Sequence, residues 1–188
     1  RAEMEHIAAL CRKWDVIAVT DEIYEHILYD GATHIPMMAI PGMRDRTLLI
    51  NSMSKTYAVT GWRVGWVLGA PDLTQSVRKV HDFLTVGAAA PLQAAGVTAL
   101  GLPDSYYDEV AEHYRDRRDR MAGMLAKAGF RCSIPKGAYY IMADISSFGR
   151  GDDVAFVQDL VARVGIAAVP GSSFFSNPEL GKDWIRFC

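Results

Sequence analysis

A lysine with two nearby serines and an arginine is the part of this sequence best suited to chemistry. The segment Ser52-Met53-Ser54-Lys55 follows an apolar run, and Arg63 comes soon after it. A lysine becomes nucleophilic when it is desolvated or lies beside other positive charge. Serine hydroxyls and a guanidinium are groups that hold a phosphate. The pattern therefore indicates a reactive amine beside an anion site, and the alternative is an ordinary exposed loop lysine.

A second polar cluster comes earlier, where Asp21 and Tyr24 follow another apolar run. A carboxylate in such a place can act as a general base, a metal ligand or the counter-ion of a cationic ring nitrogen. It can also simply cap a helix. The Asp-x-x-Tyr spacing alone does not decide among these roles.

Other catalytic patterns are incomplete. Ser52 to Lys55 satisfies the S-x-x-K pattern of serine acyl enzymes, but the S-D-N and K-T-G elements that accompany it do not occur. The sequence also has no glycine-rich nucleotide motif. The five histidines lack paired-ligand spacing, so we expect no metal site.

The elements that must position these residues indicate an α/β fold. We predict strands at 15–20, 48–51 and 64–68 and helices at 3–14, 72–83 and 91–100. Apolar runs without alternation are typical of strands buried on both faces. Open α/β sheets bind ligands at the carboxyl ends of their strands, where Asp21 and Lys55 are expected.

The best domain boundary is Gly101-Leu102-Pro103-Asp104, because Gly and Pro end one helix and Asp104 can cap the next. We therefore assign 1–103 to one domain and 104–188 to a smaller α+β domain. In the second part we predict helices at 105–128 and 152–164 and strands at 130–134, 138–144, 166–169 and 184–187. The alternating charges at 115–120 are interpreted as a solvated helix face.

Length and composition suit a globular protein of one domain or two small ones. The 188 residues carry a net charge of −2 with mixed signs, which argues against a nucleic-acid surface. Three widely spaced cysteines indicate reduced thiols and a cytoplasmic protein. No signal peptide is expected, and the uncharged run 83–103 is too rich in Ala and Gly for a membrane span.

The sequence motifs of the two clusters resemble those of a known family. D-E-I-Y at 21–24 and S-x-S-K-T-Y-A-x-T-G-W-R-x-G-W at 52–66 are similar to the pyridoxal-phosphate-dependent aminotransferases of fold type I, class I/II. The similarity continues through 135–146, 165–174 and 185–187, and it is nearest to the kynurenine/glutamine/methionine aminotransferase branch. It implies part of a large domain with a mostly parallel sheet flanked by helices, followed by a smaller α+β C-terminal domain.

The resemblance implies a role for three residues around the cofactor ring. Lys55 matches the lysine that forms a Schiff base with pyridoxal 5′-phosphate and shuttles the substrate proton. Asp21 matches the carboxylate that keeps the pyridine nitrogen protonated. Tyr24 matches the phenol that hydrogen-bonds the oxygen at the ring's 3′ position.

The resemblance also implies anchors for two anions. Ser52 and Arg63 match the phosphate ligands, and Ser54 is a further member of that set. Arg186 matches the guanidinium that binds the substrate α-carboxylate in a bidentate manner. Four aromatic residues elsewhere, Tyr139, Tyr140, Phe174 and Phe175, are interpreted as core residues, with contact to an apolar substrate as the alternative.

Family members are about twice as long, so we expect this chain to be a C-terminal half that is inactive alone. The complete protein is expected to be a homodimer in which the small-residue segment 87–99 packs at the interface. The leading function is transfer of an amino group from an L-amino acid to a 2-oxo acid. The alternatives are a β-lyase or synthase on the same scaffold, and a regulatory module that binds the cofactor without turnover.

Overall fold

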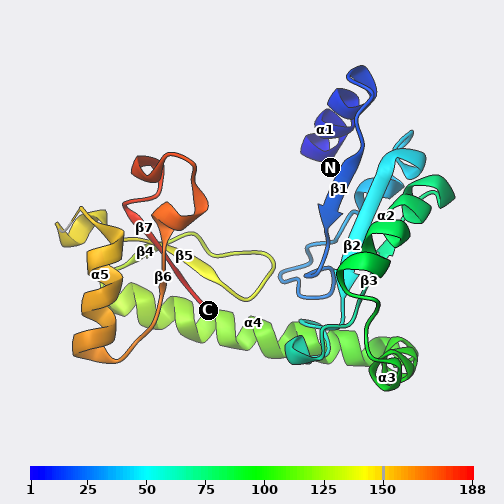
Figure 1. Ribbon diagram of the computed structural model, residues 1–188. Coiled ribbons are helices and arrows are strands. Elements are labelled where there is room, and N and C mark those ends of the chain that lie inside the picture. Colours follow the sequence, from blue (N-terminus) through cyan, green and yellow to red (C-terminus); the bar gives the residue numbers. More distant parts are fainter. Residues whose placement is uncertain (150) are drawn as a thin grey trace. The chain divides into compact units, whose positions relative to one another are not determined.

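The computed structural model describes residues 1–149 and 151–188. The chain forms two compact units, the first made of 1–26 and 33–110 and the second of 27–32 and 111–188 (Figure 1). Each unit has its own sheet. The assignment of 1–103 and 104–188 as cofactor-binding and small domains stays a prediction.

The sheet of the first unit positions the two polar clusters predicted from the sequence. Its strands β1 (Ala18–Asp21), β2 (Thr47–Ser52) and β3 (Gly65–Leu68) lie in the order β1-β2-β3. β1 and β2 are parallel, so both carboxyl ends lie at one edge of the sheet. β3 returns antiparallel to β2, which the sequence pattern did not indicate.

The helices of the first unit lie close to where they were predicted. They are α1 (Ala2–Lys13), α2 (Pro71–Leu84) and α3 (Ala90–Leu100), with short 3-10 turns η1 (Met37–Ala39), η2 (Arg44–Arg46) and η3 (Thr60–Trp62). α2 opens with Pro71 in its first turn, where the missing amide hydrogen costs nothing. A core cluster lies between α1 and the η1–η2 segment, made of Ala8, Cys11, Met37, Ile40 and Met43.

The expectation that these strands are buried on both faces is wrong for this chain. Leu49 of β2 is buried, whereas Val19 of β1 is 62% exposed and Leu68 of β3 is 48% exposed. Thr47 and Leu49 mark the covered face, and the described residues leave part of the opposite face open. An apolar run without alternation indicates that both faces of a strand are apolar, but it does not indicate which elements cover those faces.

The long helix α4 (Asp104–Lys127) begins in the first unit and ends in the second. Asp104 is its first residue and therefore lies in the first turn instead of capping the helix from outside. The prediction of a fully solvated charged face also fails at Arg118, which is buried. Its guanidinium bonds Asp30 at 2.6 Å and Asp119 at 2.8 Å, and these bonds compensate the buried charge.

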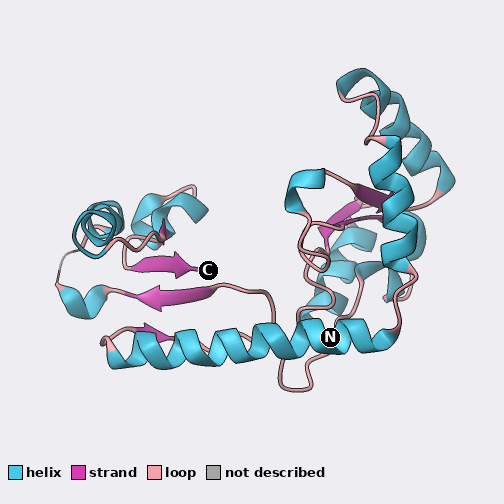
Figure 2. Cartoon of the chain, turned by 90° about the horizontal axis from the view of Figure 1, so that it is seen from below, coloured by secondary structure: helices cyan, strands magenta, loops and turns pink. Residues whose placement is uncertain are grey.

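The second unit contains an antiparallel sheet and helices, which Figure 2 shows in magenta and cyan. Its strands lie in the order β4-β5-β7-β6. Their bounds are β4 (Arg131–Cys132), β5 (Ile141–Asp144), β6 (Val169–Pro170) and β7 (Trp184–Phe187). Predicted strand 184–187 is confirmed, whereas the runs at 130–134 and 138–144 contain shorter strands.

The helix predicted at 152–164 is present in two forms. α5 (Asp153–Asp159) is capped by the Asp152 carboxylate, which accepts a hydrogen bond from the Ala155 amide, and it continues as π-helix η5 (Leu160–Val164). Gly165 ends it in the left-handed region at φ 74°. Three further 3-10 turns are η4 (Ser146–Phe148), η6 (Gly171–Phe174) and η7 (Pro178–Leu180).

The core of the second unit lies between α4, α5 and the sheet. Its buried residues are Leu125, Ile141, Ala143, Ile145, Phe156, Val157, Ile185 and Phe187. The short segment 27–32 joins this unit, because Tyr29 donates its amide to Lys136 and its hydroxyl to the Ala138 carbonyl at 2.5 Å. No helix within the described ranges is long and apolar enough to cross a membrane.

Candidate active site

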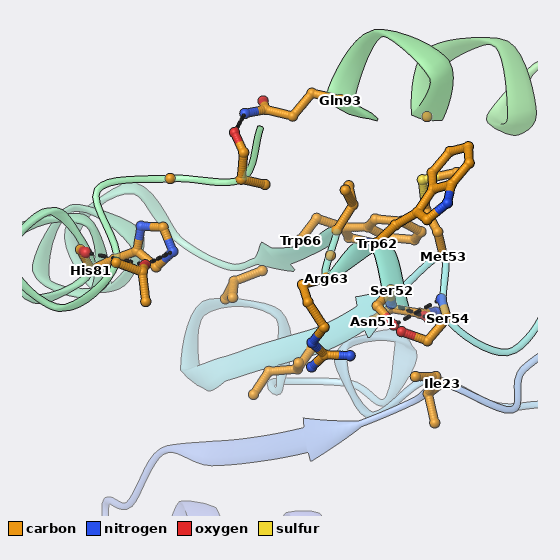
Figure 3. Close-up of a pocket in the computed structure, with 18 of the residues that line it drawn as sticks. Ile23, Asn51, Ser52, Met53, Ser54, Trp62, Arg63, Trp66, His81 and Gln93 are labelled. Atoms are coloured by element: carbon orange, nitrogen blue, oxygen red, sulfur yellow. Dashed lines mark hydrogen bonds between the residues drawn. The ribbon is translucent and has the colours of Figure 1, made fainter. Parts of the chain in front are cut away.

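A cleft of about 1210 Å³ opens in the first unit at the carboxyl edge of β1 and β2. It is lined by the ends of these two strands, the turn that follows β2, the start of β3, and side chains of α2 and α3 (Figure 3). Five residues predicted from the sequence line this one cleft: Asp21, Ser52, Ser54, Lys55 and Arg63. The structure therefore brings together a carboxylate, two hydroxyls, an amine and a guanidinium.

Backbone and side-chain bonds fix the turn that carries Lys55. The Ser54 amide donates to Ser52 Oγ at 3.2 Å, and the Ser54 carbonyl accepts from Thr60 Oγ1 at 2.9 Å. On the strand side, the Met53 amide donates to the Val64 carbonyl at 3.1 Å. Lys55 itself is half-buried. The turn is thus held on both sides while the amine stays within the cleft wall.

Tyrosines at the start of α4 hold the other end of this turn. Tyr106 donates its hydroxyl to the Thr56 carbonyl at 2.9 Å, and Thr56 is buried. The hydroxyls of Tyr57 and Tyr107 lie 2.9 Å apart. Burial, followed by this hydrogen bond, raises the pKa of Tyr57 well above its usual value of 10.0. Tyr57 is therefore a neutral phenol at physiological pH, and Lys55 gains no phenolate neighbour from it.

Arg63 enters the cleft from a strained position. It ends η3 in the left-handed region at φ 55°, where few residues other than Gly, Asn or Asp occur. Its Nη1 donates to the Thr60 carbonyl at 2.9 Å, which orients the exposed side chain. A guanidinium carries five N–H donors, so this single bond leaves capacity for an anion.

Two consecutive carboxylates at the end of β1 have different environments. Asp21 is exposed in the cleft, and its Oδ1 accepts a long bond of 3.3 Å from the Ile23 amide. Glu22 is buried and lies 2.7 Å from His34 Nε2 and 2.8 Å from Thr20 Oγ1. Side chains alternate across a strand, which sends these two acids to opposite sides. Asp21 is the one available to a ligand.

Tyr24 and Arg186 are not among the residues that line this cleft. Tyr24 lies in the turn after β1, whereas Arg186 lies on β7 of the second unit. Arg186 is half-buried, and its Nε is buried without a hydrogen-bond partner among the described residues. Such an orphaned donor is costly unless a ligand or an ordered water satisfies it.

Several further residues of the cleft wall were not predicted from the sequence. Trp62, Trp66, Arg78, His81 and Gln93 also line it, the last three from α2 and α3. Figure 3 shows His81 and Gln93 on segments apart from the β2 end that carries Ser52 and Ser54. The i, i+3 spacing of Arg78 and His81 was the available signal, since it places both on one helix face.

The interpretation of four aromatic residues as core residues is wrong for two of them. Phe174 is 46% exposed and Phe175 is 43% exposed, whereas Tyr139 and Tyr140 are half-buried. The two phenylalanines lie at the end of a 3-10 turn instead of in a strand. A short aromatic run after Gly-Ser-Ser carries no periodicity that reveals its burial.

Comparisons with known proteins agree on a family. The family model described as aminotransferase class I and II matches residues 1–188. Kynurenine–oxoglutarate transaminase 3 of Rattus norvegicus is 37% identical over 207 aligned positions, covering 100% of this chain and 45% of the relative. A probable N-succinyldiaminopimelate aminotransferase, DapC, of Mycobacterium tuberculosis is 36% identical over 180 positions, covering 96% of this chain and 45% of its own length.

Solved structures show the same likeness. The N-succinyldiaminopimelate aminotransferase of Mycobacterium tuberculosis superposes with a TM-score of 0.95 at 34% identity. That match covers 99% of this chain and 48% of the other. The chain thus spans about half the length of the curated relatives it matches.

Proposed function

We propose, from the premise that this chain belongs to the class I and II aminotransferase family, that the protein of which it forms part transfers amino groups. The donor is an L-amino acid and the acceptor a 2-oxo acid. The observation that carries this proposal is the cleft in which Lys55 is joined by Asp21, two serines and Arg63. The family generally depends on pyridoxal phosphate.

The groups in the cleft match the cofactor's chemistry. Pyridoxal phosphate, when bound, supplies an aldehyde and an electron-withdrawing ring that stabilises negative charge on the substrate α-carbon. It has a basic ring nitrogen and a dianionic phosphate. The exposed Asp21 carboxylate suits a protonated ring nitrogen, and the serine hydroxyls with Arg63 suit the phosphate. The cofactor therefore fits the residues present.

The chain's own residues would divide the work between holding and proton transfer. Lys55 would hold the cofactor through its amine and, once released, carry the proton removed from the substrate α-carbon. Asp21 would keep the ring nitrogen charged, and Tyr24 would donate a hydrogen bond to the ring oxygen. Ser52, Ser54 and Arg63 would fix the phosphate, which prevents the ring from turning.

Arg186 would bind the substrate α-carboxylate. Its buried Nε without a partner supports a role in binding an anion, because a ligand carboxylate would satisfy this donor. The names of the relatives suggest donors to test first: kynurenine and N-succinyl-diaminopimelate, with 2-oxoglutarate as the acceptor. We also infer a homodimer for the complete protein, supported by the large exposed apolar side chains Phe83, Leu84 and Val97 of α2 and α3.

The test is product analysis on the full-length protein with added pyridoxal phosphate. We expect a new amino acid and a new oxo acid in equal amounts. Lys55→Ala should abolish turnover while still allowing non-covalent cofactor binding, because the phosphate and ring anchors remain. Borohydride reduction should fix the cofactor covalently to the protein with Lys55 and not to the Lys55→Ala variant, and mass spectrometry detects the difference.

The matched control is Lys79→Ala, which removes an exposed lysine of α2 that does not line the cleft. It should keep both turnover and covalent attachment. Normal amino transfer by Lys55→Ala would contradict the proposed role of Lys55. Ammonia and a cleaved side chain as the products would instead indicate a lyase on the same scaffold, and cofactor binding without any turnover would indicate a regulatory module.

A further inference from the structure

We propose that Tyr140 and Phe174 are positioning residues for the carboxylate-binding edge of Arg186, an inference that rests on the proposed role of Arg186 as an anion anchor. The Arg186 guanidinium carbon lies 5.2 Å from the centre of the Tyr140 ring and 4.8 Å from that of Phe174. Both distances lie within the range of cation–π attraction.

The sheet places these rings on the two sides of one strand. β7 is an inner strand, paired with β5 on one side and β6 on the other. Arg186 is opposite Met142 of β5 and Val169 of β6. Tyr140 immediately precedes β5, and Phe174 follows β6 at the end of η6. An aromatic ring therefore reaches the guanidinium from the end of each neighbouring strand.

Arg186 lies on the face of β7 away from the core. Its neighbours Ile185 and Phe187 are both buried in the hydrophobic cluster of the second unit. Because side chains alternate along a strand, the guanidinium is directed to the other face. On that face the two aromatic rings shield the guanidinium from water. No acid is paired with Arg186 among the described residues.

The turn that carries Phe174 is held rigidly. The Ser172 amide donates to Oδ2 of Asp153 at 2.7 Å, and Asp153 is buried. Gly171 approaches the Gly181 and Trp184 carbonyls so closely that a Cβ there would collide with them. A ring on such a turn keeps its place without a ligand, so the guanidinium is ordered in advance.

This arrangement has a consequence for binding. Rings stabilise the guanidinium without using its N–H groups, so the donors stay available to a planar, bidentate anion. An acid as a partner would instead compete with the substrate carboxylate. Preorganisation by the rings also removes part of the ordering cost when the anion binds. Removing either ring should therefore weaken carboxylate binding selectively.

The experiment measures how much a carboxylate adds to binding. The full-length, cofactor-loaded protein is titrated with 3-phenylpropionate and with 3-phenylpropanamide, which has the same shape but no charge. The Kd of the amide divided by the Kd of the acid measures the contribution of the carboxylate to binding. We expect Phe174→Leu and Tyr140→Leu each to reduce this ratio by about 2- to 30-fold. Phe174→Tyr and Tyr140→Phe keep the rings and should restore it.

The adjacent Phe175 is the matched control. It has nearly the same exposure as Phe174, but its ring makes no cation–π contact with Arg186. Phe175→Leu should change both Kd values together, if at all, and leave the ratio unchanged. The positioning role would be overturned if Phe174→Leu gave the same ratio as the control Phe175→Leu, or if Phe174→Tyr failed to restore the ratio of the unsubstituted protein.

Arg186→Gln separates this inference from the function on which it rests. The substitution should remove the preference for the acid over the amide. A variant that keeps this preference would show that Arg186 does not bind the carboxylate, which defeats that part of the proposed function. A lost preference in Arg186→Gln, with unchanged ratios in both ring variants, would leave the role of Arg186 intact and defeat the ring hypothesis alone.

Discussion

Neighbouring residues of like chemistry take different roles here because the backbone sends them to different environments. Asp21 and Glu22 are both acids, yet the first faces the cleft and the second is buried among donors. Glu22 is bound to the backbone amide of Met37 as well as to Thr20 and His34. The Glu22 carboxylate is thus occupied by bonds within the fold, whereas Asp21 faces the cleft, which is why the proposed role in binding the cofactor is assigned to Asp21.

A second acid, Asp144, gives a prediction about pH. Hydrogen bonds from Ser146, together with the Arg131 guanidinium 2.6 Å away, lower the pKa of Asp144 below its usual value of 3.8. A lowered folded-state pKa stabilises the protein above the unfolded pKa, and the stabilisation is lost as the pH falls through the folded pKa. We expect Asp144→Asn to cost about 1 kcal/mol at neutral pH.

The same difference should shrink as the pH falls through the pKa of the folded state, and it should vanish once the acid is protonated in both folded and unfolded chains. Urea unfolding of both proteins at several pH values measures it. Asp116→Asn is the control, because Asp116 is exposed and its one ion pair among the described residues is a long one, 3.6 Å from Arg115. It should change stability by less than about 0.5 kcal/mol at any pH. A difference for Asp144→Asn that persists unchanged in acid would contradict the linkage.

At the scale of elements, short turns hold the side chains of the two proposed sites in place. The turn after β2 carries Lys55 and is fixed by Thr60 and Tyr106. The turn η6 carries Phe174 and is fixed by Asp153. In both cases a regular strand ends and hydrogen bonds from other elements define the irregular backbone. The sites are precise because these turns are anchored on each side.

Glycine gives a prediction at this scale. Gly171 of η6 has the carbonyl oxygens of Trp184 and Gly181 where a Cβ would stand. Both obstacles are backbone atoms, which cannot rotate away. Gly171→Ala should therefore lower the free energy of unfolding by about 3 kcal/mol. Thermal or urea unfolding of the purified chain measures it.

Gly123 of α4 provides the matched control, because a Cβ there meets no atom within 4 Å. Gly123→Ala should raise the free energy of unfolding by about 1 kcal/mol, since alanine is the better helix former. The same substitution should thus act in opposite directions at the two positions. Similar values at both would show that the close approach at Gly171 relaxes without cost.

At the scale of the whole molecule, the cleft is wide open. Its volume of about 1210 Å³ exceeds the roughly 300–1,000 Å³ typical of ligand pockets, which enclose most of the ligand's surface. Relatives are about twice as long as this chain. We therefore propose that this chain supplies the amine and the cationic anchors of the cofactor site, and we expect other parts of the protein to supply much of the enclosure.

This predicts that the 188-residue chain alone binds pyridoxal phosphate more than about tenfold more weakly than the full-length protein, because less of the cofactor is enclosed. It should also transfer no amino groups at a measurable rate. Absorbance titration with the cofactor and product analysis test the two statements, with the Lys55→Ala chain as the control for covalent attachment. Amino transfer by the isolated chain would contradict this prediction.

The sequence by itself determined the kinds of elements and the chemical groups of the cleft. Proline at the start of α2 and glycine after η5 act through local backbone geometry, so their positions could be read directly. The S-x-S-K and G-W-R segments placed an amine and a guanidinium within one loop. Their closeness follows from chain connectivity.

Only the tertiary structure decided which distant groups meet and which faces are covered. His81 and Gln93 join the cleft, and Tyr140 and Phe174 reach Arg186, through contacts between elements far apart in the chain. The exposure of Val19 and the burial of Arg118 likewise depend on what packs against them. Local patterns record a residue's preferences, whereas burial and pairing depend on partners that the fold brings from elsewhere.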